Sequence, residues 1–300
     1  MTTTRGRSRY LDPATLQKIG SLDLVAREVV EGLRVGVHKS PLHGFSTEFV
    51  HHRQYVPGDN LRHIDWRVYG RTQRYYVKLY EAETNFDANL LLDASSSMHY
   101  GSGPVSKLEY AKFMIASLAY LIVHQQDSVG LGVFDSKLRR YLPPSGSPAI
   151  VQDIARELEG AEPEPRTDMG ELLHQFAIRL KRRGHVMLFS DLLDNVDKLV
   201  HGLDHLRFGG HNVTVFHILD PAELTFPFTG TCKFEGLEES AELLTEPRRV
   251  REAYLAELKK LIDRIRGACE RTKVDYVLVD TSQPVDEVLS AYLISRMRNA

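Results

Sequence analysis

The chain has 300 residues and 42% of them are hydrophobic, so it can bury a substantial core in one large domain or two moderate ones. Its formal net charge of -2 gives no overall preference for nucleic acid or for an anionic membrane. Two cysteines, Cys232 and Cys269, are too few for a disulfide framework and lack metal-ligand spacing, so we expect both to be reduced thiols.

No targeting or membrane signal is apparent in the sequence. The basic residues near the start are followed by no apolar stretch, which argues against a secretory signal. The longest apolar run, residues 115–123, is too short to span a bilayer and is interrupted by Ser117 and Tyr120. We therefore expect a cytoplasmic protein without a transmembrane segment.

The first part of the chain differs in composition from the rest. Residues 1–86 contain 13 Lys/Arg and 9 Asp/Glu, a local excess of positive charge. We expect residues 1–11 to form a disordered basic arm. Residues 12–83 are expected to form an N-terminal module with helix up to about residue 37, followed by strand-like pieces around the turn formers Pro57, Gly58 and Asp59.

From residue 87 onward, strand and helix patterns alternate regularly. Helices are expected over 107–125, 148–158, 169–183, 196–208 and 247–271. Strands are expected to end at Asp93 and to cover 128–134, 185–190, 212–219 and 273–279, with an antiparallel edge strand over 137–142 that Pro143 and Pro144 should end. Residues 84–300, with a loop or hairpin insertion at 221–246, are thus predicted to form an α/β domain with a doubly wound, mainly parallel sheet.

The most informative stretch is residues 90–98, Leu-Leu-Leu-Asp-Ala-Ser-Ser-Ser-Met. An apolar run ends at Asp93, and hydroxyls follow at alternate positions, Ser95 and Ser97. This pattern indicates a buried strand whose exit loop carries oxygen ligands at the edge of the sheet where ligands bind in open α/β folds. Two later loops offer further oxygens, Thr167 and Asp191. Hydroxyls and carboxylates without His or Cys suit a hard cation such as Mg²⁺.

These residues resemble the metal-ion-dependent adhesion site of von Willebrand factor A domains, which combines Asp-x-Ser-x-Ser with a later Thr and a later Asp. The resemblance implies a von Willebrand factor A-like fold. It also implies a bound divalent cation, Mg²⁺ or another such as Mn²⁺ or Ca²⁺, which recruits an acidic residue of a partner protein. The matching positions are Asp93, Ser95, Ser97, Thr167 and Asp191. Asp168 and Asp194 are close in sequence to Thr167 and Asp191, and either carboxylate could act as an outer-shell group of the ion.

A second resemblance lies in the preceding segment. Residues 53–59 (Arg-Gln-Tyr-Val-Pro-Gly-Asp), 62–67 (Arg-His-Ile-Asp-Trp-Arg), 71–72 and 77–78, followed by the A-type domain, look like the bacterial family called domain of unknown function 58. The resemblance spans about residues 30–280. Members of that family are commonly encoded beside MoxR-type AAA+ ATPases, which implies an accessory role in chaperone-like assembly or maturation of client proteins.

The mixed charges of this segment have two interpretations. The simpler one is an internal network of ion pairs around the turn, with Trp66 buried as its hydrophobic anchor. The other is a docking surface, because Arg, Trp and Tyr are enriched at binding hot spots.

Two alternative functions compete with a non-enzymatic, metal-dependent interaction module. The basic, aromatic segment 53–80 could contact phosphates and stack on bases, although the excess of positive charge is small. A hydrolase is less well supported, because the Gly-x-Ser-x-Gly elbow and a Walker lysine loop are both absent from the sequence. We therefore expect no enzymatic activity and no nucleic-acid partner.

Overall fold

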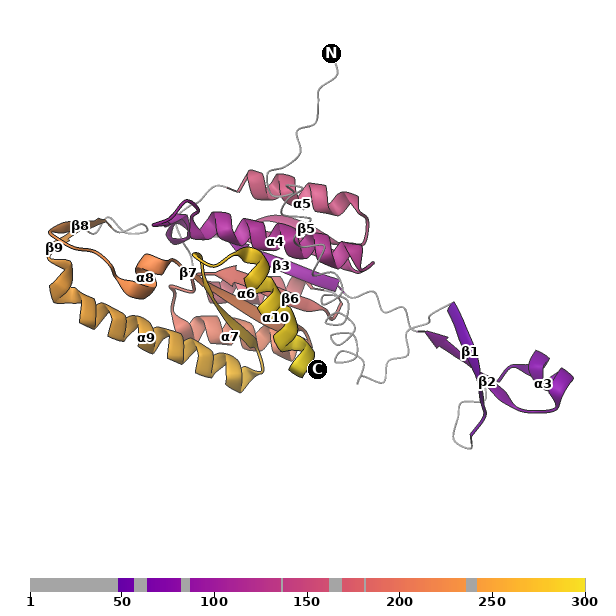
Figure 1. Cartoon of the computed structure of the whole chain (residues 1–300). Helices are drawn as coiled ribbons and strands as arrows, with labels where there is room; N and C mark the ends of the chain where they lie inside the picture. Colours follow the sequence, from indigo (N-terminus) through magenta and orange to yellow (C-terminus); the bar gives the residue numbers. More distant parts are fainter. Residues whose placement is uncertain are drawn as a thin grey trace, which may run out of the picture. The chain divides into compact units, whose positions relative to one another are not determined.

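The computed structural model describes residues 48–56, 64–81, 87–135, 137–161, 169–180, 182–235 and 242–299 (Figure 1). Contacts divide the chain into two units, one that contains residues 86–300 and one within residues 38–85. The predictions for the basic arm, the first helix and the turn at 57–59 lie outside the described residues, and the predicted domain boundaries stay predictions.

The larger unit is built on a six-stranded sheet with the strand order β10-β7-β6-β3-β4-β5. Every neighbouring pair is parallel except β4 and β5, which are antiparallel. This confirms the predicted α/β class with a mainly parallel sheet. The strands are β3 (Asp87–Asp93), β4 (Ser128–Phe134), β5 (Leu138–Ser145), β6 (His185–Ser190), β7 (Asn212–Leu219) and β10 (Asp275–Asp280).

Helices cover both faces of this sheet because alternate side chains of its strands point to opposite sides. On β3, Leu90 and Leu92 join one buried cluster, whereas Leu91 joins another. The first cluster packs against α4 (Lys107–His124), α5 (Ala149–Glu159) and α10 (Val285–Asn299). The second packs against α6 (Met169–Arg179), α7 (Val196–Phe208) and α9 (Pro247–Thr272) (Figure 1). None of the described helices has both the length and the hydropathy to cross a membrane.

Shorter elements complete the carboxyl side of the unit. The chain leaves β3 through the 3-10 helix η3 (Ser96–His99), and it leaves β7 through the short helix α8 (Pro221–Thr225). The insertion expected over 221–246 contains this helix and an antiparallel hairpin of β8 (Cys232–Glu235) and β9 (Glu242–Thr245).

Two predicted boundaries differ from the structure, and one helix was not predicted. The edge strand β5 continues to Ser145, past Pro143 and Pro144, because an edge strand tolerates the missing N–H of proline on its unpaired side. Helix α6 ends at Arg179, four residues before the predicted end. Helix α10 was not predicted; its apolar residues Leu289, Tyr292 and Leu293 complete the first cluster.

The smaller unit pairs β1 (Glu48–Gln54) with β2 (Tyr76–Glu81) in antiparallel fashion, and between them lies α3 (Trp66–Thr72). Asp65 begins this helix, because its Oδ1 accepts from the backbone N–H groups of Arg67 and Val68. Trp66 is 62% exposed, so its interpretation as a buried anchor is wrong. Among the residues of this unit whose burial is described, Ile64 and Val77 are buried and apolar, and they form a β-bridge.

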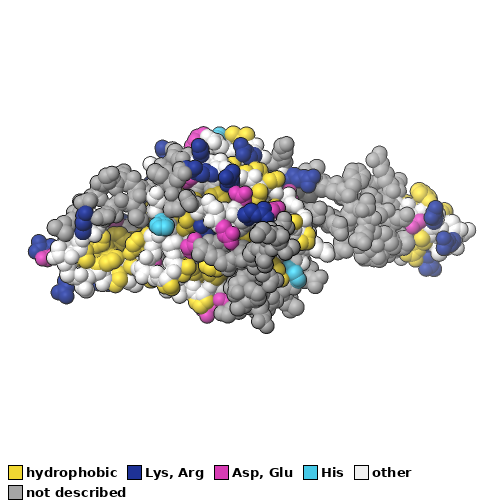
Figure 2. All heavy atoms as spheres, turned by 90° about the horizontal axis from the view of Figure 1, so that it is seen from above, with side chains coloured by type: hydrophobic (Ala, Val, Ile, Leu, Met, Phe, Trp, Pro, Cys, Tyr) yellow, Lys and Arg dark blue, Asp and Glu magenta, His cyan; other side chains and the backbone are white. Residues whose placement is uncertain are grey.

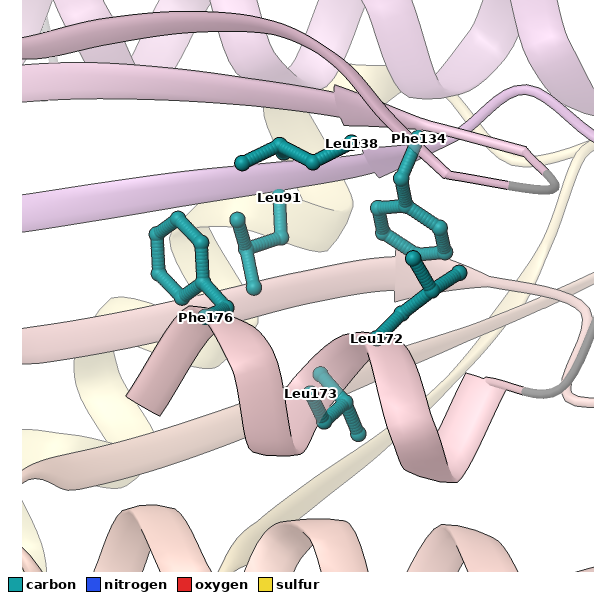
Figure 3. A pocket seen from close by; sticks show the side chains of 6 residues that line it. All are labelled: Leu91, Phe134, Leu138, Leu172, Leu173 and Phe176. Atoms are coloured by element: carbon teal, nitrogen blue, oxygen red, sulfur yellow. The ribbon is translucent and has the colours of Figure 1, made fainter. Parts of the chain in front are cut away.

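A pocket lies between the sheet and α6 (Figure 3). Its lining side chains are all hydrocarbon: Leu91, Phe134, Leu138, Leu172, Leu173 and Phe176. Because a binding site for a polar substrate needs placed hydrogen-bonding groups, this pocket is a packing feature of the core.

Charged side chains are mixed on the surface. On the face drawn in Figure 2, dark-blue Lys and Arg side chains lie interspersed with magenta Asp and Glu side chains.

Buried histidine makes the stability of the larger unit depend on pH. Burial, with Arg296 and Arg207 nearby, holds the pKa of His185 well below its ordinary value, and the ring pairs with Thr214 Oγ1 at 2.7 Å. In the unfolded chain this histidine binds a proton below about pH 6.5, so it lowers the free energy of unfolding as the pH falls below that value.

We predict that His185→Gln makes the pH dependence of unfolding shallower between pH 7 and pH 5, by about 1.4 kcal/mol per pH unit below about pH 6. Urea unfolding at several pH values measures this slope. The exposed His201 provides the control, since His201→Gln should leave the slope unchanged. An unchanged slope in His185→Gln would contradict the assignment of this pH dependence to His185.

Candidate metal centre

Strand register brings two of the predicted loops together. β3 and β6 are parallel neighbours with Leu92 opposite Phe189, so Asp93 and Ser190 end adjacent strands at the same edge of the sheet. Asp93 is 1% exposed, and Ser190 and Asp191 are fully buried. The apolar run before Asp93 therefore drives a carboxylate into a position without solvent, where it needs polar partners.

Hydrogen bonds hold the Asp93 carboxylate in place. Its Oδ1 accepts from the backbone N–H of Ser95 at 2.9 Å, and its Oδ2 accepts from the hydroxyl of Ser190 at 2.6 Å. Ser190 Oγ in turn accepts from Leu192 N at 3.0 Å. Ser190 thus joins the two loops, a role that the sequence analysis missed although the polar pair at the end of an apolar strand was visible.

The two serines of the motif converge. The turn of η3 brings Ser95 Oγ and Ser97 Oγ to 3.1 Å from each other, and both residues are buried. Two oxygens at adjacent corners of an octahedron around Mg²⁺, each about 2.1 Å from the ion, lie about 3 Å apart. The hydroxyl spacing therefore fits a shared magnesium ion.

Asp191 follows β6 directly and contacts a lysine. Its Oδ2 accepts from Lys107 Nζ at 2.9 Å, and its Oδ1 accepts from Leu193 N at 3.3 Å. The intervening Leu192 is fully buried with a positive φ of 52°, a backbone conformation that is costly for a side chain with a Cβ. The turn after β6 is therefore held in a strained conformation that directs Asp191 toward the lysine.

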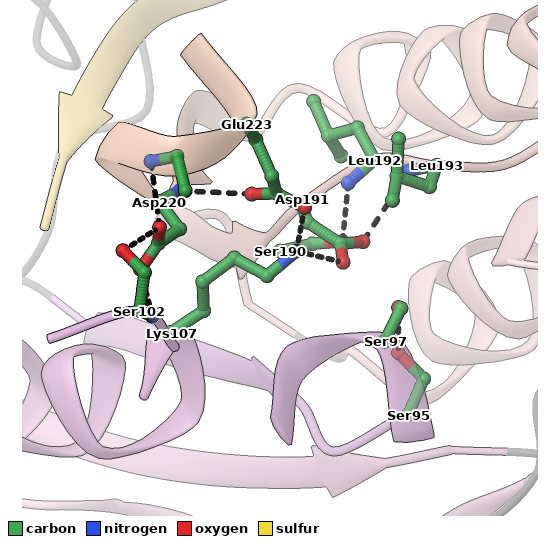
Figure 4. A network of polar contacts seen from close by, with 11 residues as sticks. Ser95, Ser97, Ser102, Lys107, Ser190, Asp191, Leu192, Leu193, Asp220 and Glu223 are labelled. Carbon is green, nitrogen blue, oxygen red and sulfur yellow. Dashed lines mark hydrogen bonds and ion pairs between the residues drawn. The ribbon is translucent and has the colours of Figure 1, made fainter. Parts of the chain in front are cut away.

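Lys107, the first residue of α4, is fully buried and has one of the largest side chains without solvent exposure. Its ammonium lies between Asp191 and Glu223 of α8, whose Oε1 accepts at 2.7 Å (Figure 4). Burial by itself lowers the pKa of Lys107, but the charges of Asp191 and Glu223 raise it above its ordinary value. The ammonium is therefore charged at neutral pH.

A neighbouring histidine adds no positive charge. His217 on β7 is buried, and burial lowers its pKa to about 4 against the opposing effect of the Asp191 charge. The imidazole is neutral at pH 7 and pairs with the hydroxyl of Tyr276 at 2.7 Å. The charges that matter around Asp191 are thus those of Lys107 and Glu223.

Glu223 is fixed by the capping of α8. Its Oε2 accepts from Asp220 N at 2.8 Å, and Asp220 Oδ1 accepts from Ala222 N, which together form a capping box. Ser102, in the loop before α4, donates its backbone N–H to Asp220 Oδ2 at 2.8 Å. The carboxyl ends of β6 and β7 and the start of α4 are therefore joined by one polar network.

The structure brings four of the five predicted ligands to one edge of the sheet: Asp93, Ser95, Ser97 and Asp191. Thr167 and Asp168 lie outside the described residues. Asp194 serves elsewhere, since its Oδ2 accepts from Met169 N at 2.9 Å and so begins α6 beside the Asp191 loop. Metal binding itself stays a prediction.

The proposed metal ligands are unusual because they include serine hydroxyls. Within the described residues no group of three or more His, Cys, Asp and Glu side chains could hold a metal by itself. A cation at this edge would need the hydroxyls of Ser95 and Ser97 in addition to the carboxylates. Such a set suits Mg²⁺ better than Zn²⁺, which prefers nitrogen and sulfur.

Comparison with known proteins agrees with this architecture. The family described as "Protein of unknown function DUF58" matches residues 51–261. An uncharacterized protein of Mycobacterium tuberculosis, Rv1480, is 23% identical over 232 residues, which cover 76% of this chain and 72% of that protein.

Two solved structures are similar to this chain at low sequence identity. An aerotolerance-related membrane protein from Bacteroides fragilis has a TM-score of 0.50 and 17% identity, over 72% of this chain and 100% of that one. The VWA domain of SpRpn10 has a TM-score of 0.42 and 13% identity, over 69% of this chain and 94% of that one. The sheet order described above and the likeness to the first of these structures agree with the predicted α/β fold with a mainly parallel sheet.

Ser190 provides a test of the loop network. We predict that Ser190→Ala lowers the free energy of unfolding by about 1–3 kcal/mol, because Asp93 Oδ2 and Leu192 N lose a buried partner. Urea denaturation measures the change. Ser282→Ala, which removes an exposed hydroxyl bonded to Asp280, is the control and should change stability by less than about 1 kcal/mol. If Ser190→Ala and Ser282→Ala lowered the free energy of unfolding equally, the proposed contribution of the Ser190 contacts to stability would be contradicted.

Proposed function

Because this chain belongs to the DUF58 family of proteins of unknown function, we propose that it is a non-enzymatic interaction module that binds a protein partner through a divalent cation. The single observation that supports this most is that two buried carboxylates, Asp93 and Asp191, and two hydroxyls 3.1 Å apart lie at the same carboxyl edge of the sheet. Ligands bind at this edge in open α/β folds.

The roles of the residues follow from their chemistry. Ser95 and Ser97 would coordinate the ion directly, and Asp93 and Asp191 would supply negative charge as ligands or through bound water. Thr167, two residues before α6 in the sequence, is proposed as a fifth ligand. Mg²⁺ is the ion that we favour, with Mn²⁺ and Ca²⁺ as alternatives. With five ligands from the protein, the ion would keep a sixth coordination position for a further oxygen.

An open position on a hard cation attracts a carboxylate. We therefore propose that the partner presents an acidic side chain as the last ligand. A MoxR-type AAA+ ATPase in the cytoplasm is the partner that the family context suggests, and the complex would act in chaperone-like assembly or maturation of clients.

The local chemistry favours binding over hydrolysis. Ser95 Oγ pairs with Ser97 Oγ, whereas a nucleophilic serine needs a hydrogen-bonded base. Burial lowers the pKa of His217 to about 4, which makes it a weak base, and its Nδ1 pairs with the hydroxyl of Tyr276. These contacts support an interaction role for the motif.

Calorimetric titration with Mg²⁺ tests the metal site. We predict heat of binding for the native protein and none for Asp93→Ala, since this change removes a buried charge beside the hydroxyls. Ser97→Ala should weaken binding by about tenfold or more.

Ser96 provides the matched control, because it lies between the two proposed ligands and outside the proposed set. Ser96→Ala should bind Mg²⁺ as the native protein does. Equal binding by the native protein and Asp93→Ala would remove the proposed site.

Partner recruitment is tested by biolayer interferometry with the MoxR-type ATPase of the same organism. We predict binding in Mg²⁺, loss of binding in EDTA, and a reduction of about tenfold or more in Ser97→Ala, because the acidic ligand of the partner loses its ion. The control Ser96→Ala should bind normally. Binding that persists unchanged in EDTA contradicts a metal-mediated contact.

Nucleic-acid binding by the smaller unit is the second candidate. Helix α3 exposes Trp66, Arg67 and Arg71, side-chain types that can stack on bases and contact phosphate. A single-stranded oligonucleotide that binds with a steep salt dependence, and fails to bind Trp66→Ala, would favour this candidate over the interaction module.

A further inference from the structure

The metal site as proposed leaves one group without a role. Lys107 places a full positive charge on Asp191, one of the proposed ligands, at 2.9 Å and with no solvent exposure of either side chain. Burying a lysine is costly, so the pair must be compensated by good geometry and further partners. The second carboxylate, Glu223 at 2.7 Å, provides this compensation.

Two cations cannot share one carboxylate freely in a buried site. A divalent ion close to Asp191 would repel the ammonium by several kcal/mol at the distances of this cluster. The hydroxyls of Ser95 and Ser97 lie on the neighbouring loop, on the side of Asp191 that Figure 4 shows across from α8. An ion bound by these hydroxyls and Asp191 would therefore compete with Lys107 for the same charge.

We infer that Lys107 is an internal counter-ion that competes with the divalent cation for Asp191 and thereby limits the metal affinity of the site. This inference rests on the proposed function, since it concerns the same ion. Lys107 belongs to none of the sequence motifs. Its competition with the ion would keep the affinity of the site for the ion low.

Glu223 makes the competition reversible. The ammonium contacts both carboxylates, so when an ion takes Asp191 the lysine keeps Glu223 as its partner and is not left uncompensated. Glu223 is itself held by the capping box of α8, and Asp220 of that box is bonded to the loop that leads to α4. The two partners of Lys107 thus lie on different elements, β6 and α8, and the lysine can favour one or the other.

The decisive variant is the double change Lys107→Met and Glu223→Gln. It removes one positive and one negative charge, so the net charge of the cluster is unchanged while Asp191 loses its counter-ion. We expect Mg²⁺ to bind this variant at least about tenfold more tightly than the native protein in calorimetric titration. Mg²⁺ should also raise its melting temperature by more than it raises that of the native protein, because the ion replaces the missing counter-ion.

Lys112 supplies the matched control on the same helix. It is 3% exposed and is paired with Glu109 at 3.3 Å, and its ammonium also donates to Ala161 O. The control Lys112→Met and Glu109→Gln removes an equivalent buried pair of charges away from Asp191. It should leave the Mg²⁺ affinity within about twofold of the native value even if it lowers stability as much.

The outcomes separate the two proposals. Tighter binding by the Lys107 double variant supports the inference, and this holds even if the native protein binds no Mg²⁺, a result that would count against the proposed function alone. Equal or weaker binding by the double variant, with binding by the native protein, overturns the inference and leaves the proposed function in place. Absence of binding in both proteins overturns both.

Discussion

Buried negative charge at one edge of the sheet is the constraint on which the rest of the site depends. Asp93 and Asp191 end adjacent strands with almost no solvent contact, and a carboxylate in such a place is stable only with hydrogen bonds or a counter-ion. The structure supplies both kinds of compensation. Asp93 is held by backbone and hydroxyl donors, whereas Asp191 is paired with a lysine.

This division of roles explains why the two carboxylates are not equivalent. Asp93 is fixed by contacts within its own loop and with Ser190, so its position does not depend on any ion. Asp191 accepts one backbone N–H and is otherwise paired with the ammonium of Lys107, a positive charge that a metal could replace. Under the proposed function, such a site would stay folded without metal and would respond to the ion.

Much of the larger unit could be predicted from the sequence because the signals were local. Apolar runs ended by polar residues marked β3 and β6. The start of α4 is also fixed locally, since Ser106 Oγ accepts from Glu109 N at 3.2 Å. The motif around Asp93 was visible for the same reason.

What the sequence could not show were interactions between distant residues. Lys107 looks like an ordinary first residue of a helix, and its burial follows only from partners 84 and 116 positions away. Trp66 was interpreted as buried because it is aromatic, but the cap by Asp65 begins a helix with no buried residues. Helix α10 contributes to the core although no pattern singled it out.

The most direct test of the central claim is a crystal structure of the protein grown with Mn²⁺, which scatters anomalously. The account predicts an anomalous peak about 2.1–2.3 Å from Ser95 Oγ and Ser97 Oγ, with Lys107 Nζ moved away from Asp191 toward Glu223. A crystal with Mn²⁺ at saturating concentration, no peak at this edge and Lys107 still on Asp191 would contradict it.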